Sequence, residues 1–226
     1  MTTVSRTLYE FPLCPFCRKV RLLLFEKGLS YNMIQEIPWA RRPEFLKINP
    51  AGMVPVLIEP DGYALTDHVS ICEYINEIQP SPDLMRETPR GRAEVRRLTN
   101  WFDSIFYWEV YKPLVGEKVE KALRYSKEPD SNLIRAGRAN LKRHLMYTDW
   151  LCARRNYLAG RYISMADLAA VAHLSVLDYL GEIEWDKYPS VKEWYSKIKR
   201  RDSFNALLTD RLTGIIPSEI YANLDF

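Results

Sequence analysis

The spacing of apolar positions divides the chain into two regimes. Across residues 6–78, short runs typical of strands alternate with stretches typical of helices. Residues 7–11 and about 30–36 predict two strands. Between them, apolar side chains at i, i+4, i+7 and i+8 from Phe16 predict a helix that ends at Gly28.

A second group of elements follows in the same regime. Residues 54–59 and 63–65 predict two strands joined by the Asp-Gly turn at 61–62, and a helix is expected over about 67–78. The order is strand, helix, strand, and then strand, strand, helix. This order predicts an α/β domain of the thioredoxin-like type.

The second regime is helical. Pro80 and Pro82 predict a linker, because two prolines in three residues cannot continue a helix. Thr88-Pro89 predicts a helix start, and a bend is expected at Pro113. No strand pattern follows position 89. We therefore expect four segments: a thioredoxin-like domain at 1–79, a linker at 80–88, an all-helical C-terminal domain at 89–211 and a C-terminal tail at 212–226.

Composition narrows the class of protein. Of the 226 residues, 47% are hydrophobic and 27% are charged, which fits a globular chain rather than a disordered one. No apolar run reaches the length of a membrane span, and no signal peptide is apparent at the N-terminus. We therefore expect a cytoplasmic protein that does not insert into a membrane.

Charge gives weak information about partners. The net charge of +3 does not indicate a nucleic-acid binder. Residues 1–82 carry 8 basic and 9 acidic side chains, so the basic excess belongs to the rest of the chain. A local cluster there indicates either a solvated helix face or a contact with an acidic partner; its members are Arg86, Arg90, Arg92, Arg96 and Arg97.

The clearest chemical motif is Cys14-Pro-Phe-Cys17, at the junction between a predicted strand and a predicted helix. A thiol at a helix N-terminus faces unpaired N–H groups and the positive end of the helix dipole, which stabilise thiolate. Cys14 is therefore the candidate nucleophile and Cys17 a candidate resolving thiol. The motif indicates the fold more strongly than it indicates activity.

These features resemble the glutathione S-transferase family over nearly the whole chain. The match covers the thioredoxin-like domain, the proline linker, the helical domain and the Ser164–Asp167 capping box. The resemblance implies that Val54-Pro55 contains a cis peptide bond opposite the thiol. Val54 would then present its backbone to the cysteinyl part of glutathione; a trans proline at a strand start is the alternative.

The expected ligand site departs from the family at one pair of residues. Transferases usually carry Glu-Ser at the start of the helix after the fourth strand, where the pair holds the glutamyl end of glutathione. Here the pair is Asp67-His68. The imidazole is expected to crowd this pocket, and losing a hydrogen bond to a charged ligand group costs about 1.5–3 kcal/mol. Val54, Pro55, Asp67 and His68 are therefore expected to be the vestige of a glutathione site.

Two segments indicate protein contacts. The loop at 37–43 carries Trp39, Arg41 and Arg42, which are residue types enriched at interface hot spots. Trp39 could instead pack on its own domain or line a glutathione pocket. The tail ends in Asp225 and Phe226 and is too apolar for a frayed terminus, so it either packs back on the body or binds a partner.

The stretches at 38–43, 66–71 and 177–181 and the ending Tyr-Ala-Asn-Leu-Asp-Phe also resemble a non-catalytic, FtsZ-binding branch of the family. This resemblance implies a homodimer that binds filaments of the tubulin-like division protein FtsZ at the division site. Other division proteins are candidate partners of the tail, and no cofactor, metal or catalytic residue is expected. The alternative is a glutathione-dependent thiol transferase that uses Cys14 and Cys17.

Overall fold

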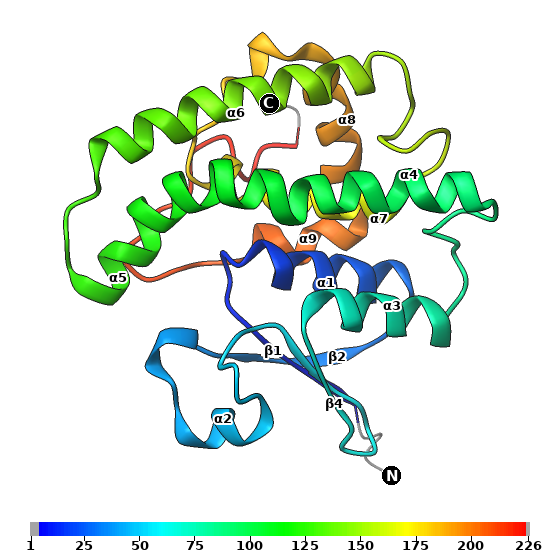
Figure 1. The fold of residues 1–226 in the computed structure, drawn as a ribbon, viewed down its shortest axis with the longest axis vertical. Coiled ribbons are helices and arrows are strands. Elements are labelled where there is room, and N and C mark those ends of the chain that lie inside the picture. Colours follow the sequence, from blue (N-terminus) through cyan, green and yellow to red (C-terminus); the bar gives the residue numbers. More distant parts are fainter. Residues whose placement is uncertain (1–4, 225–226) are drawn as a thin grey trace. The chain divides into compact units, whose positions relative to one another are not determined.

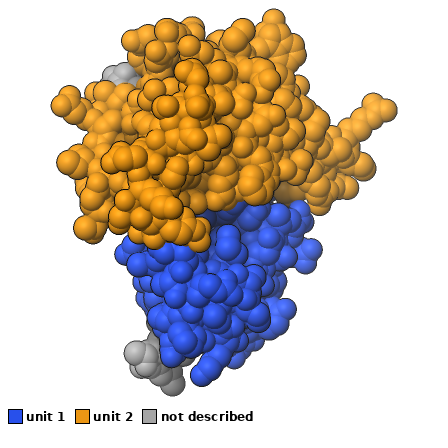
Figure 2. Space-filling view, turned by 60° about the vertical axis from the view of Figure 1, so that its left-hand side comes forward, with its two compact units in different colours: residues 1–84 blue, residues 85–226 orange. Residues whose placement is uncertain are grey.

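A computed structural model describes residues 5–224 of the chain. The chain forms two compact units, residues 1–84 and residues 85–226, which Figure 2 distinguishes by colour. The division falls inside the segment expected to be the linker.

Unit 1 contains a four-stranded mixed sheet with the strand order β2-β1-β3-β4. β1 pairs with β2 in parallel, and β3 runs antiparallel to both β1 and β4. The sheet confirms the predicted order of strands. β2 and β3 are shorter than expected, whereas β1 and β4 have the expected length and are shifted by one residue. Their bounds are β1 Arg6–Glu10, β2 Tyr31–Gln35, β3 Val56–Ile58 and β4 Ala64–Thr66.

Helices cover the sheet of unit 1. α1 (Pro15–Glu26) and α3 (His68–Ile78) lie side by side (Figure 1). The ring of Tyr9 in β1 lies 5.4 Å from that of Phe45 in α2 (Pro43–Ile48), whereas the preceding Leu8 is fully buried. Because neighbouring side chains of a strand point to opposite faces, Tyr9 and Leu8 serve different faces of the sheet.

The loop expectation for residues 37–43 is wrong in part. Residues Pro38–Ala40 form the 3₁₀-helix η1, and α2 begins at Pro43. Both elements start with proline, whose fixed φ suits the first helical position. Elements of three and six residues are too short to display a helical period, so the pattern of apolar positions could not reveal them.

Unit 2 is built from helices, as predicted. Thr88 caps α4 by accepting a hydrogen bond from the backbone N–H of Gly91 at 3.1 Å, and Pro89 is the first helical residue. The helical path continues through Pro113 to residue 125, and its middle part is π-wound. The elements are α4 Pro89–Asn100, η2 Trp101–Glu120, α5 Lys121–Tyr125, α6 Ser131–Cys152, α7 Met165–Tyr179, η3 Trp185–Lys187, α8 Pro189–Lys199 and α9 Asp202–Leu208.

α7 forms the core of unit 2, because every one of its residues is buried. The capping box expected at its start is present: the hydroxyl of Ser164 donates to Asp167 Oδ2 at 2.7 Å, and the Ser164 N–H donates to the same oxygen at 2.9 Å. Asp167 Oδ1 also accepts hydrogen bonds from the Leu158 N–H and the Trp194 indole. The buried carboxylate therefore joins three segments of the unit.

The described part of the C-terminal tail packs back on unit 2. Tyr221 is buried, its ring lies 5.0 Å from that of Tyr179, and its hydroxyl donates to the carbonyl of Leu207 at 2.8 Å. Ser218 donates its N–H to the carbonyl of Tyr179 at 2.7 Å. Most of the tail is thus part of the helical domain, while Ile216 remains 88% exposed.

Candidate functional site

The register of the sheet brings the predicted site residues of unit 1 to one end. Tyr9 lies opposite Val56, and Val56 lies opposite Thr66. The chain leaves β1 toward Cys14, enters β3 from Pro55 and leaves β4 into Asp67, so these three positions meet at the same end of the sheet. We call Cys14, Val54, Pro55, Asp67 and His68 the sheet-end cluster.

Cys14 occupies the position expected of a nucleophile. It is the N-cap residue of α1, is half-buried, and its Sγ accepts the backbone N–H of Cys17 at 3.4 Å. The sulfur therefore lies at the N-terminal end of α1, against the backbone N–H of its first turn.

Cys17 is placed differently. It is completely buried, and burial together with the nearby Cys14 raises the pKa of its thiol well above the ordinary value. A thiol with a raised pKa forms little thiolate at neutral pH and is a poor attacking group. Both cysteines are free thiols in the structure.

Val54 and Pro55 are buried, and the peptide bond between them is cis, as expected. Asp67 has a φ of 74°, in the left-handed region that non-glycine residues rarely adopt. Its Oδ1 accepts the N–H groups of Val69 at 2.8 Å and Ser70 at 3.1 Å. The carboxylate thus caps its own helix and takes two N–H donors that could otherwise bind a ligand carboxylate.

His68 is fixed over the first turn of α1. Its ring stacks on Phe16 with centroids 4.2 Å apart and planes 5° apart, and its Nδ1 lies 2.9 Å from the ammonium of the buried Lys19. Because an ammonium group only donates, Nδ1 is the acceptor and the ring proton lies on Nε2. The imidazole therefore occupies space within the sheet-end cluster, over the start of α1.

The loop at residues 37–43, here called the Trp39 loop, is the second candidate site. The half-buried Trp39 packs edge-on against Phe11, with ring centroids 5.1 Å apart at 71°. This contact fixes one side of the indole to its own domain, and the side chain stays partly exposed. Trp39 therefore combines the structural role and the exposure that a contact residue needs.

The two arginines of this loop have different surroundings. Arg42 donates to the buried carboxylate of Glu36 at 2.6 Å and lies 3.7 Å from Glu44. Arg41 is exposed and has a φ of 47°. Its guanidinium lies close to Gly52: a Cβ added to this glycine would be 3.2 Å from Nη1 of Arg41. Arg41 therefore presents the less neutralised charge of the two.

Asp225 and Phe226, the predicted contacts of the tail, lie outside the described residues. Within residues 5–224, no three His, Cys, Asp or Glu side chains are grouped so that they could hold a metal ion. In the same range, no helix is both long and apolar enough to cross a membrane.

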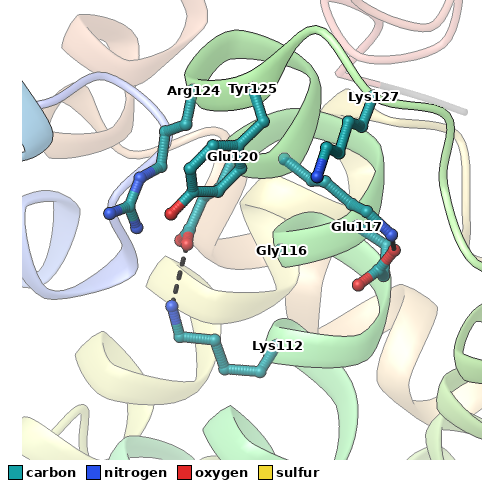
Figure 3. A pocket seen from close by; sticks show the side chains of 8 residues that line it. Lys112, Gly116, Glu117, Glu120, Arg124, Tyr125 and Lys127 are labelled. Carbon is teal, nitrogen blue, oxygen red and sulfur yellow. Dashed lines mark hydrogen bonds and ion pairs between the residues drawn. The ribbon is translucent and has the colours of Figure 1, made fainter.

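Two cavities in unit 2 could not be predicted from the sequence. The cavity of about 410 Å³ in Figure 3 is lined by residues of η2, α5 and the segment after it. Its two carboxylates are both paired: Lys112 donates to Glu120 at 2.8 Å, and Lys121 donates to Glu117 at 2.7 Å. The second cavity, of about 730 Å³, lies along α6. The sequence signal for such cavities was charged residues at helical spacing. The same spacing is typical of ordinary solvated helix faces, so it could not distinguish a cavity from such a face.

Comparison with known proteins places these features in a family. The model of the glutathione S-transferase N-terminal domain matches residues 8–83, and that of the C-terminal domain matches residues 124–202. FtsZ-localized protein A of Caulobacter vibrioides is 44% identical over 227 residues, which covers 99% of this chain and 100% of that protein.

Two solved structures have nearly the same fold. FzlA from C. crescentus superimposes with a TM-score of 0.96 at 44% identity, covering 99% of this chain and 100% of that one. A glutathione S-transferase from Rhodospirillum rubrum F11 also has a TM-score of 0.96, at 48% identity, covering 98% of this chain and 100% of that one. The chain therefore belongs to the glutathione S-transferase family.

Proposed function

We propose that this protein is a non-catalytic, dimeric scaffold that binds FtsZ filaments and promotes constriction at the division site. One observation carries the proposal: a relative named for its localisation with FtsZ matches the chain from end to end, in sequence and in fold. Fold alone does not assign this function, because transferases share it.

The geometry of the sheet-end cluster supports the non-catalytic part. A glutathione site requires donors for the glutamyl carboxylate, and Asp67 already takes the N–H groups of Val69 and Ser70. An imidazole fixed by Phe16 and Lys19 stands where the family carries a serine hydroxyl. No cofactor is required for the proposed function.

The Trp39 loop is the proposed filament contact. Its indole is held rigid by Phe11, and Arg41 is exposed beside it. A large, pre-positioned aromatic ring loses little conformational entropy on binding, which is why tryptophan and arginine recur at interface hot spots.

Large exposed apolar side chains support self-association. Val69 projects from α3, and Trp108, on η2, is 66% exposed; Met146, on α6, is equally exposed. Exposed apolar side chains of this size favour contact with another protein surface. A two-fold dimer would present two Trp39 loops to one filament and gain affinity through effective concentration. Light scattering of the purified protein should give twice the chain mass; a monomer at micromolar concentration would contradict this part.

Cosedimentation with FtsZ polymers tests the filament contact. Trp39→Ala should reduce the fraction of protein in the pellet with little change in melting temperature, because Trp39 is only partly buried. Cys14→Ser serves as the matched control and should sediment like the parent. Equal sedimentation of all three proteins would overturn the role of the Trp39 loop.

The alternative function is a thiol transferase. The Cys14 thiolate would attack the disulfide of a glutathionylated substrate, release the substrate thiol and form a mixed disulfide, which a second glutathione would reduce to glutathione disulfide. The N-cap position of Cys14 favours this chemistry. Calorimetric titration with glutathione, together with a turnover assay, decides between the scaffold and the enzyme. Heat of binding at cellular glutathione concentrations, with turnover that Cys14→Ser abolishes, would favour the enzyme.

The tail remains a candidate contact for other division proteins. Because Tyr221 anchors it to unit 2, a truncation that removes residues 223–226 keeps the anchor and isolates the end of the chain. Normal division with this truncated protein would contradict a role of the tail.

A further inference from the structure

The cavity along α6 differs in charge from the one shown in Figure 3. It has a volume of about 730 Å³ and is lined by Lys118 of η2 and by residues of the first three turns of α6. Four of its lining residues are cationic and, in the part of the chain that the structure describes, none is acidic. We call this cavity the α6 groove; it is lined by Lys118, Ser131, Ile134, Arg135, Arg138, Ala139 and Lys142.

The cations of the groove are only partly neutralised. Lys118 and Arg138 share one carboxylate, that of Glu182, to which Arg138 donates two hydrogen bonds at 2.9 and 3.2 Å. Burial opposes ionisation of Glu182, but the hydrogen bonds from Arg138 and Lys118 outweigh it and lower its pKa. Glu182 therefore stays ionised and cancels one of the two charges.

The other two cations have no such partner. Among the described residues, Arg135 has a hydrogen bond to the amide oxygen of Asn132 but no ion pair, and Lys142 has neither. The charge of Lys142 acts on Glu184, but that carboxylate is itself paired with Lys187. The groove thus keeps a net positive charge, and no carboxylate is among the described residues that line it.

This arrangement works against the stability of α6. Arg135, Arg138 and Lys142 are spaced by three and four residues, so their side chains line one face of the helix and repel one another. A local arrangement that opposes stability is expected where a binding site has been retained.

The floor of the groove determines the kind of ligand. Ile134 and Ala139 add an apolar surface between the cations. The site is an open, concave groove that an extended peptide segment can enter, unlike the broad face that a lipid surface requires. In the part of the chain that the structure describes, no aromatic ring lines the groove to stack on nucleic-acid bases. We propose that the α6 groove binds an acidic peptide segment of a partner protein, with carboxylates on Arg135 and Lys142 and an apolar side chain on Ile134.

Fluorescence anisotropy with a labelled peptide of alternating glutamate and leucine tests this proposal. The intact protein should bind this peptide more tightly than the same peptide with glutamine in place of glutamate, and the difference should shrink at high salt. Arg135→Glu with Lys142→Glu should weaken binding about tenfold or more, because two attractions become repulsions. Both side chains are exposed, so the fold should tolerate the change, and circular dichroism verifies it.

The matched control reverses two other exposed cations of unit 2. Arg161→Glu with Lys197→Glu changes the net charge equally but alters only cation–π contacts, with Tyr162 and Tyr157. The control should change peptide affinity less than about twofold. Equal loss in both double variants, equal binding of the glutamine peptide, or absence of binding by the parent would overturn the proposal. Binding to phosphatidylglycerol vesicles in place of the peptide would overturn it as well.

Discussion

At position 68, the side chain is held by two neighbours that the sequence places 49 and 52 residues away. His68 stacks on Phe16 and accepts from Lys19, so the imidazole is part of a built arrangement rather than a loose surface group. The sequence could reveal that the serine of a glutathione site is missing. It could not reveal the stacking, because that depends on how α1 and α3 pack together.

Replacing His68 tests whether this side chain is what weakens glutathione binding. His68→Ser supplies the missing hydroxyl, and we expect calorimetry to show glutathione affinity about tenfold or more above that of the parent. His68→Ala opens the same space without the hydroxyl and serves as the control. Equal affinities of the serine and alanine variants would show that the hydroxyl is not the missing contact.

Glu94 gives a prediction about pH. Hydrogen bonds from Arg97 and Arg155 outweigh partial burial and lower its pKa to about 2. Because the folded state holds this carboxylate ionised more strongly than the unfolded state does, its stabilisation is present above the ordinary glutamate pKa of about 4.3. That stabilisation is lost as the pH falls toward 2.

Thermal unfolding across pH measures this effect. Glu94→Gln should destabilise the protein at pH 7, and the difference from the parent should disappear between about pH 4.5 and about pH 2. Burial raises the pKa of Asp167 and Asp178, so the stability they contribute is present at low pH and is lost as the pH rises. Comparing the parent with Glu94→Gln removes these contributions; the exposed Glu87→Gln is the control. A constant difference across this range would contradict the assignment.

At the scale of elements, close contact between η2 and α6 organises unit 2. Gly137 lies where the two helices approach most tightly, because an added Cβ would come within 2.9 Å of both Pro113 and Leu114. The glycine is required by this approach and not by its backbone conformation, which is helical. The same two helices contribute the walls of the α6 groove.

Gly137→Ala should therefore destabilise the protein, although alanine favours helix by about 1 kcal/mol. Overpacking of about 1–3 kcal/mol should exceed this gain, and urea unfolding measures the difference. Gly116→Ala is a matched control in η2, since its Cβ would lie 3.7 Å from Cδ of Lys112, an ordinary contact. Equal stability of the two variants would contradict the tight approach.

The elements that the sequence predicted best have either a clear period or a clear cap. α7 begins with the Ser164–Asp167 box, which is visible without a structure. The short elements η1 and α2 were missed because neither is long enough to show a period. The sequence of the tail was compatible with packing on the body or with binding a partner. The contacts of Tyr221 show that the described part of the tail packs on unit 2.

At the scale of the whole molecule, the fold does not determine the function. The Cys14 motif and the succession of a β-rich and a helical regime predicted the family, which the matches to both domain models confirm. The same fold serves a relative named as a glutathione S-transferase and a relative named as FtsZ-localized, at similar identity. The surface side chains of each unit, and not the fold, must therefore determine the partner.

Sedimentation of the purified protein with FtsZ polymers tests the central claim most directly. With nucleotide that supports polymerisation, the protein should pellet with FtsZ in a saturable manner, and it should stay in the supernatant when FtsZ is kept unpolymerised or is absent. If the protein remains in the supernatant with polymers present, across low and physiological salt, the scaffold account is contradicted.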